Sequence, residues 1–149
     1  MRIAELVRRS AVGVHPEQTV AESAGLMEQA GVGSLAVVDA DGRLVGIVTD
    51  RDLVRRVMAR GLPPDARIDG VMSTPVATLD ADDDVQDAYR LFRSHAVRRL
   101  AVTRAGRFVG MVSIDDLLPL LAAQLADLCR PIAGEAASAQ RDSPVPVTT

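Results

Sequence analysis

The 149-residue chain contains no lysine, no asparagine and no tryptophan, and it has a single cysteine. All 17 of its basic residues are therefore arginines, a bias that fits the codon usage of a GC-rich bacterial genome. The single Cys129 excludes an internal disulfide and fits a reducing cytosol. Aromatic residues make up only 2%, which argues against the stacking platforms of single-stranded nucleic-acid binders and predicts an aliphatic core.

The net charge and the lengths of the apolar runs indicate which partners and which cellular location to expect. A net charge of −3 gives no reason to expect DNA or an anionic membrane as a partner. No signal peptide is expected, because Arg8 and Arg9 interrupt the opening residues before an apolar core forms. The most apolar run, residues 117–128, contains Gln124 and Asp127 and is shorter than the roughly 20 residues that a bilayer requires. We therefore expect a cytoplasmic protein without a membrane span.

The chain contains the same unit twice. Residues 3–7 align with residues 68–72 at an offset of 65 (68 − 3), and this offset holds through the middle of each unit. It falls to 64 (110 − 46) after a turn, where Gly46 aligns with Gly110. A single deletion placed in a turn is what a structural repeat tolerates. The sequence therefore predicts two homologous halves.

Each half has the pattern β-α-β-β-α. A short extended segment leads to a helix with apolar residues at helical spacing, and two strands joined by turn residues follow before a second helix. The expected elements are extended segments at 11–14 and 76–79, helices starting near Thr19 and Asp84, middle strands at 35–38 and 100–103, and last strands ending at Thr49 and Ser113. Neither half can bury enough apolar area alone. We expect an α+β fold in which the two repeats pack sheet to sheet about a pseudo-two-fold axis.

Breaks in the pattern set the expected boundaries. Pro63 and Pro64 end the helix before them, which places repeat 1 at residues 1–62 and repeat 2 at residues 63–129. Pro119 is expected to kink or restart the last helix. Residues 130–149 are rich in Ala, Ser, Pro and Thr and are expected to form a disordered tail.

The motif that could bind a ligand is a hydroxyl residue followed three positions later by an aspartate. It occurs as Thr49 with Asp52 and again as Ser113 with Asp116. Such a pair is close to the capping box of a helix N-terminus, and most isolated examples are simply caps. A binding role is favoured by three features: a buried strand directly before the hydroxyl, a glycine three residues upstream, and the occurrence of the whole set in both halves. Both interpretations remain open on the residues alone.

These sequence features resemble a known family. The pattern Gly-apolar-apolar-Thr/Ser-x-x-Asp lies in a β-α-β-β-α unit, with Val-Met-Ser-Thr-Pro-Val at 71–76 and Val-Gly-Ser-Leu-Ala-Val-Val-Asp at 32–39. Together they resemble a CBS domain, and two in tandem resemble a stand-alone CBS pair, or Bateman module, over residues 1–128. The resemblance implies a regulatory module. No nucleophilic triad or P-loop is present, and His15, His95 and Cys129 lack the number and spacing of zinc ligands, so neither catalysis nor a metal site is expected.

The resemblance also implies a ligand site. In ligand-binding members, the motif Asp accepts both ribose hydroxyls of an adenosine nucleotide, and the Thr or Ser contacts ribose or phosphate. An apolar pocket holds the adenine, and basic residues before the middle strand meet the phosphate. The implied residues are Thr49, Asp52, Val12 and Gly33 in the first copy and Ser113, Asp116, Val76, Val97, Arg98 and Arg99 in the second. Since the first copy has Gly33-Ser34 where the second has arginines, the second is predicted to bind phosphate better, unless these arginines are only solvated surface charge.

The expected ligand is AMP, ADP or ATP, with NAD or S-adenosylmethionine as further possibilities and no cofactor. Related CBS pairs dimerise into a flat disc through their helices, and four aliphatic residues would suit a homodimer: Leu53, Val57, Leu121 and Leu125. Ligand occupancy would then be reported to a regulated protein outside this chain. The alternatives are a CBS scaffold that binds no nucleotide but dimerises and recruits a partner protein, and an enzyme with a site atypical of the family.

Overall fold

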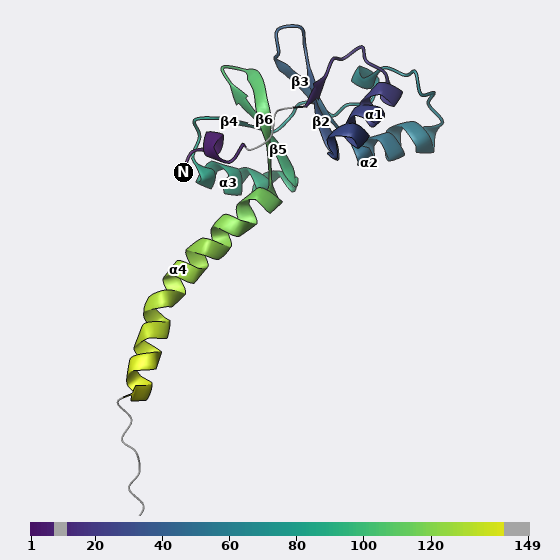
Figure 1. Cartoon of the computed structure of the whole chain (residues 1–149). Coiled ribbons are helices and arrows are strands. Elements are labelled where there is room, and N and C mark those ends of the chain that lie inside the picture. Colours follow the sequence, from purple (N-terminus) through teal and green to yellow (C-terminus); the bar gives the residue numbers. More distant parts are fainter. Residues whose placement is uncertain (8–11, 142–149) are drawn as a thin grey trace, which may run out of the picture. The chain divides into compact units, whose positions relative to one another are not determined.

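The computed structural model describes residues 1–7 and 12–141, with side chains to residue 134 (Figure 1). The chain divides into a first unit, Met1–Ser113, and a second unit that begins at Ile114. The first unit contains both sheets, and the described part of the second is the single helix α4 (Ile114–Arg141).

The first repeat forms a three-stranded sheet in the order β1-β2-β3, with β1 parallel and β3 antiparallel to the central β2. Its helix α1 begins after Thr19, whose side chain accepts a hydrogen bond from the Glu22 amide, and ends at Gly31 in the left-handed conformation. A helical stretch with a π-helical middle follows β3. The elements are β1 (Gly13–Val14), α1 (Val20–Ala30), β2 (Ser34–Val38), β3 (Leu44–Thr49), α2 (Asp50–Asp52), η2 (Leu53–Val57) and η3 (Met58–Arg60).

The second repeat reproduces this topology with a sheet in the order β4-β5-β6. Asp84 caps its helix by accepting a hydrogen bond from the Gln86 amide, which lowers the pKa of the Asp84 carboxyl. The elements are η4 (Ile68–Gly70), β4 (Thr78–Asp80), α3 (Val85–His95), β5 (Arg99–Arg104) and β6 (Arg107–Ser113). The predicted α+β fold with two β-α-β-β-α repeats is confirmed.

The opening segments of the two repeats are exchanged. η1 (Ile3–Glu5) lies against repeat 2, where the Ile3 amide donates to the Asp83 carbonyl over 2.9 Å. Reciprocally, the segment around η4 lies against repeat 1, where the Ile68 amide donates to the Gln18 carbonyl over 2.8 Å. The boundary between residues 62 and 63 therefore separates sequence repeats, whereas each packed half contains a segment of the other.

The repeated glycines lie where the exchanged segments cross the last strand of each sheet. A Cβ at Gly46 would come within 3.0 Å of the Met72 side chain, and a Cβ at Gly110 within 3.0 Å of the Val7 side chain. Both positions therefore require glycine for close packing. This explains the shared glycine of the motif without any ligand.

The core of the first repeat is aliphatic, as the composition predicted. Its buried members come from the sheet and from both helical segments, and the exchanged η4 segment contributes two further residues. The cluster consists of Val14, Val20, Met27, Leu35, Val37, Val48, Val57, Ile68 and Val71. The exchanged segment is therefore part of the hydrophobic core, and its packing couples the two repeats.

Helix α4 differs from the expectation in two respects. It continues through Pro119 and Pro131, so the predicted restart at Pro119 is not found. It also includes residues 130–141, where a tail was predicted, and the alanine-rich composition there favours helix. Residues 142–149, the rest of the predicted tail, lie outside the described residues.

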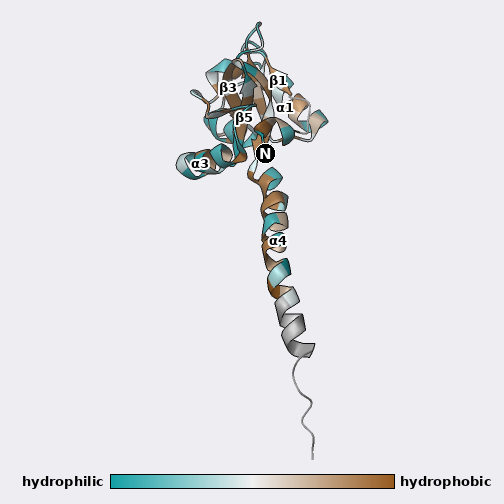
Figure 2. Ribbon diagram, turned by 90° about the vertical axis from the view of Figure 1, so that its left-hand side faces the viewer, coloured by the Kyte–Doolittle hydropathy of each residue, from teal (hydrophilic) through white to brown (hydrophobic). Residues whose placement is uncertain are grey.

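Much of helix α4 is apolar in composition. Within the described residues, Ile114–Gly134 is long and apolar enough, by length and composition, to cross a membrane. Figure 2 shows that hydrophobic residues are interspersed with polar ones along α4.

Candidate functional site

The first copy of the motif forms a complete capping box. Thr49 ends β3, and its Oγ1 accepts a hydrogen bond from the Asp52 amide over 3.1 Å. The Asp52 Oδ2 accepts one from the Thr49 amide over 2.9 Å. The structural interpretation of the motif is therefore realised in this copy, and both side chains take part in starting the helical stretch.

The second oxygen of Asp52 faces an arginine. Arg56 Nε lies 3.7 Å from Asp52 Oδ1, and Arg56 Nη1 donates to the carbonyls of Val71 and Met72 over 2.9 and 3.1 Å. Arg56 thus joins the motif to the exchanged segment of repeat 2. A carboxylate has about four lone-pair sites, so Asp52 still has acceptor capacity beyond its cap and its ion pair.

Gly33 lies beside the motif and close to two charged groups. The neighbouring Ser34 pairs with Thr49 in the sheet, and the Asp50 amide donates to the Gly33 carbonyl over 3.0 Å. A Cβ at position 33 would lie 3.0 Å from Asp50 Oδ2 and 3.7 Å from Arg99 Nη2. The first copy, which has no arginine directly before β2, therefore has one from β5 of the second copy close to Gly33.

Arg99 lies close to the first copy of the motif region as well as belonging to the second repeat. The sequence suggested a phosphate contact in the second copy, whereas the structure places its guanidinium near Gly33 of the first copy. No sequence signal locates this contact, because it depends on how the two sheets pack. Arg98 and Arg99 are both exposed.

The remaining predicted site residues lie in several elements. Val12 is half-buried and its carbonyl accepts a hydrogen bond from the Ala36 amide over 3.4 Å, next to β1. Val76 and Val97 are also half-buried. In the second copy of the motif, Ser113 is the last residue of β6 in the first unit, and Asp116 lies in the first turn of α4 in the second unit.

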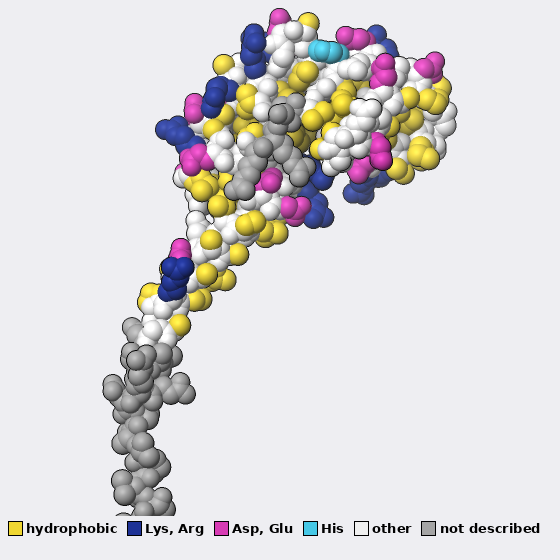
Figure 3. Space-filling view, in the orientation of Figure 1, with side chains coloured by type: hydrophobic (Ala, Val, Ile, Leu, Met, Phe, Trp, Pro, Cys, Tyr) yellow, Lys and Arg dark blue, Asp and Glu magenta, His cyan; other side chains and the backbone are white. Residues whose placement is uncertain are grey.

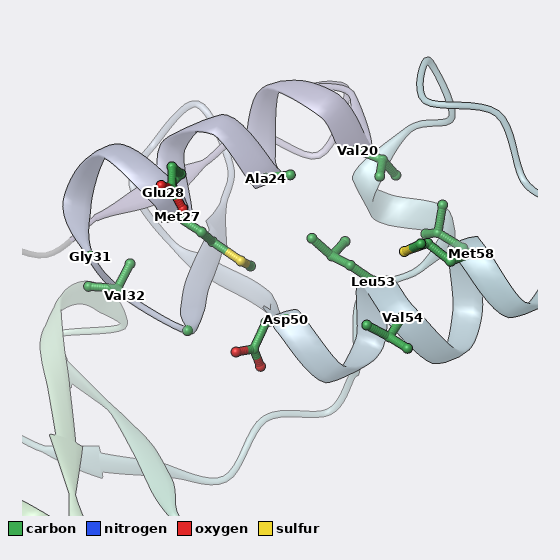
Figure 4. Close-up of a pocket in the computed structure, with 12 residues that line it drawn as sticks. Val20, Ala24, Met27, Glu28, Gly31, Val32, Asp50, Leu53, Val54 and Met58 are labelled. Atoms are coloured by element: carbon green, nitrogen blue, oxygen red, sulfur yellow. The ribbon is translucent and has the colours of Figure 1, made fainter.

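An apolar groove of about 560 Å³ lies between α1 and the helical stretch that follows β3. Figure 4 shows Met27 and Leu53 pointing into it from the two sides, with Val54 and Met58 along one helix. Gly33 and Asp50 belong to both the groove and the motif region, and Glu28 adds a second carboxylate. Met27 belongs both to the lining of the groove and to the buried core cluster of the first repeat.

The comparison with known proteins identifies the repeats. The CBS domain family matches residues 3–59 and again residues 68–123. The chain belongs to the CBS-domain family. The two matches confirm a tandem CBS pair.

Two curated relatives show how far the similarity extends. The CBS domain-containing protein YhcV of Bacillus subtilis is 38% identical over 104 residues, which cover 70% of this chain and 74% of YhcV. The uncharacterized protein MK0525 of Methanopyrus kandleri is 35% identical over 118 residues, which cover 78% of this chain and 60% of MK0525. This CBS pair therefore spans less than two thirds of MK0525.

Two solved structures share the fold. The CBS domain protein PAE2072 from Pyrobaculum aerophilum, complexed with AMP, has a TM-score of 0.76 and 29% identity, over 85% of this chain and 99% of that one. Hypoxic Response Protein I with two coordinated zinc ions has a TM-score of 0.73 and 28% identity, over 78% of this chain and 96% of that one. Among the described residues of the present chain, no group of three or more His, Cys, Asp or Glu side chains could hold a metal ion.

Proposed function

We propose that this CBS pair is a regulatory module of the cytoplasm that binds an adenine nucleotide and catalyses no reaction. The observation that carries the proposal is the meeting of three features at the start of α2. These are the Thr49–Asp52 motif, the backbone of Gly33 and the Arg99 guanidinium from the other repeat. The AMP bound to the similar protein PAE2072 supports the class of ligand.

Each group has a role that its chemistry suits. The Asp52 carboxylate accepts hydrogen bonds and can receive both hydroxyls of a ribose cis-diol. Charge-assisted hydrogen bonds of this kind contribute about 1.5–3 kcal/mol each. Arg99 offers a planar guanidinium that matches phosphate oxygens. Val12 supplies apolar surface and a backbone carbonyl for the base.

A CBS scaffold without a ligand is the second candidate, and one observation favours it. The hydrogen-bonding groups of Thr49 and Asp52 have partners within the chain, in the capping box and in the ion pair with Arg56. Under this alternative, the motif only starts a helix and holds the exchanged segment. The protein would then dimerise and recruit a partner protein without sensing a nucleotide.

A thermal-shift panel separates the two candidates. The full chain is heated with AMP, ADP, ATP, NAD or S-adenosylmethionine at a range of concentrations. A site filled at 100 times its dissociation constant adds about 2.7 kcal/mol of stability, so at least one adenine nucleotide is expected to raise the melting temperature by several degrees. If none of the five ligands moves the melting temperature, the scaffold is the correct function.

Replacing Arg99 by Gln tests where the phosphate lies. We expect the affinity for AMP, measured by calorimetry, to fall about tenfold, because one charge-assisted hydrogen bond of about 1.5 kcal/mol is lost. Affinity for adenosine, which has no phosphate, should stay the same. Arg98→Gln is the matched control, since it removes the same charge one residue away. Equal losses in both variants would mean that only the general positive charge matters.

A further inference from the structure

Three arginines meet where the two β-hairpins end. Arg104 and Arg107 pair across the turn between β5 and β6, and Arg107 also forms a β-bridge with Arg43, which directly precedes β3. The Phe108 amide donates to the Gly42 carbonyl over 3.0 Å and so joins the two hairpins. Residues that pair directly across antiparallel strands project their side chains from the same face. We call Arg43, Arg104 and Arg107 the arginine ladder.

The arginine ladder places three like charges side by side. A guanidinium is always charged, and like charges directly opposite each other on a sheet are destabilising. All three side chains are exposed, and Arg43 Nη1 lies 3.2 Å from where a Cβ of Gly106 would be, over the turn of the second hairpin. Figure 3 shows arginine side chains in dark blue near the top left of the molecule, where Figure 1 draws the two hairpin turns. The ladder therefore favours an anionic group that lies across it.

Other exposed arginines of this chain have a carboxylate partner. Arg67, for example, pairs with Asp69 over 2.7 Å. Over the described residues, no carboxylate lies within 4.0 Å of a guanidinium of the ladder. Asp39 and Asp41 belong to the adjacent turn, but Asp39 Oδ1 accepts hydrogen bonds from the backbone amides of Asp41 and Arg43 instead. The described part of the chain thus leaves the ladder without a counter-charge.

The size and surroundings of the ladder suit a short acidic segment of a protein. Neighbouring strands lie about 4.8 Å apart, so three of them present the arginines over about 10 Å. Small ligands are enclosed by concave pockets, whereas these side chains are exposed at hairpin ends. Arginine binds carboxylates through two parallel hydrogen bonds and is enriched in protein interfaces.

An acidic turn limits the positive surface on one side. Asp80 pairs with Thr103, so the aspartate-rich residues 80–84 begin next to Arg104. A long nucleic acid or an anionic membrane would extend over this turn and be repelled by it. A short acidic segment can contact the arginines alone.

We propose that the arginine ladder binds a segment of a partner protein that is rich in Asp and Glu. Arg43 belongs to the first repeat and Arg104 and Arg107 to the second, so the ladder is complete only while the two repeats keep this packing. Arg43 and Thr49 flank β3 at its opposite ends, about 20 Å apart at the rise of a strand. Nucleotide binding is not required, because no ladder residue belongs to the candidate nucleotide site.

A titration of the ¹⁵N-labelled full chain with a hexaglutamate peptide, followed by NMR without nucleotide, tests the ladder. At about 50 mM salt, the peptide should shift the amide signals of residues 42–43 and 104–107, and hexaglutamine, which has no charge, should leave them in place. Raising the salt to about 500 mM should remove most of the shift, because exposed charge pairs are screened.

Two variants that remove the same charge show where the peptide binds. Arg104→Gln/Arg107→Gln removes two charges from the ladder, and Arg55→Gln/Arg60→Gln removes two from exposed positions of the helical stretch after β3. The control should bind hexaglutamate as the wild type does, and the ladder variant should bind it about tenfold more weakly, the loss expected for two exposed ion pairs.

The melting temperature separates the loss of a binding surface from the loss of the fold. Arg107 pairs with two like-charged residues, so Arg107→Gln should raise the melting temperature slightly at low salt. A marked fall would mean that Arg107 holds the hairpins together, and would count against a role in binding.

Three results of the titration would overturn the assignment. Amide signals at the ladder that do not move would exclude it as the binding surface. Equal losses of affinity in both double variants would show that only the overall charge matters. Inorganic triphosphate that shifts these signals where hexaglutamate does not would make the ladder a site for small anions rather than for a protein.

Discussion

Asp52→Asn is expected to weaken the binding of AMP by about ten- to a hundredfold, as measured by isothermal titration calorimetry. The amide keeps a carbonyl oxygen that can still accept the Thr49 N–H of the capping box, so the helix start is preserved. It loses the negative charge and one acceptor, and so can no longer receive both hydroxyls of a ribose. The loss of one charge-assisted hydrogen bond, about 1.5–3 kcal/mol, corresponds to this change in affinity.

A ligand that lacks one ribose hydroxyl serves as the control for this substitution. The wild type should bind AMP more tightly than 2′-deoxy-AMP, because the deoxy ligand lacks one of the two hydroxyls. In Asp52→Asn that preference should largely disappear, since the two changes remove the same interaction and are therefore not additive. A variant that retains the full preference would show that another group reads the ribose.

Arg56 forms an ion pair with the same carboxylate. Its Nε lies 3.7 Å from Asp52 Oδ1, and its Nη1 donates to two carbonyls of the exchanged segment of repeat 2. A ligand that draws the Asp52 carboxylate away from Arg56 would weaken the hold of repeat 1 on this segment. If the nucleotide binds as proposed, its binding and the packing of the two repeats would be linked through Arg56, which is the kind of differential contact that a regulatory module needs.

The sequence predicted the repeat and the local elements because these depend on short-range patterns. Thr49 with Asp52 was predicted as a capping box or a binding motif, and the capping box is present. The order of strands follows from the alternation of apolar runs and turns, and both sheets have it. The α+β fold could therefore be predicted from residues close together in the chain.

The exchange between repeats and the position of Arg99 could not be predicted in the same way. Both depend on contacts between residues far apart in sequence, such as Ile3 with Asp83 and Gly33 with Arg99. The one local signal of the exchange was the glycine repeated at 46 and 110. It was interpreted as a mark of a binding site, and its packing against the exchanged segments explains it instead.

Gly110→Ala is therefore expected to destabilise the chain by about 1–3 kcal/mol, the usual cost of adding a methyl group to a packed site. The new Cβ would collide with a Val7 side-chain methyl, and valine is β-branched and cannot easily turn away. Gly46→Ala meets the side chain of Met72, which is unbranched and flexible, so its cost should be smaller. Urea unfolding followed by circular dichroism measures both free energies of unfolding.

Gly25→Ala is the matched control, because Gly25 is exposed within α1 and an added Cβ meets nothing within 4 Å. Alanine is the better helix former by about 0.8–1 kcal/mol, so this variant should be more stable than the wild type. The same methyl group thus has opposite effects at two glycines, according to whether an exchanged segment crosses there. If Gly110→Ala unfolded at the wild-type urea concentration, Val7 would not be packed on β6, and the glycine of the motif would again require a ligand to explain it.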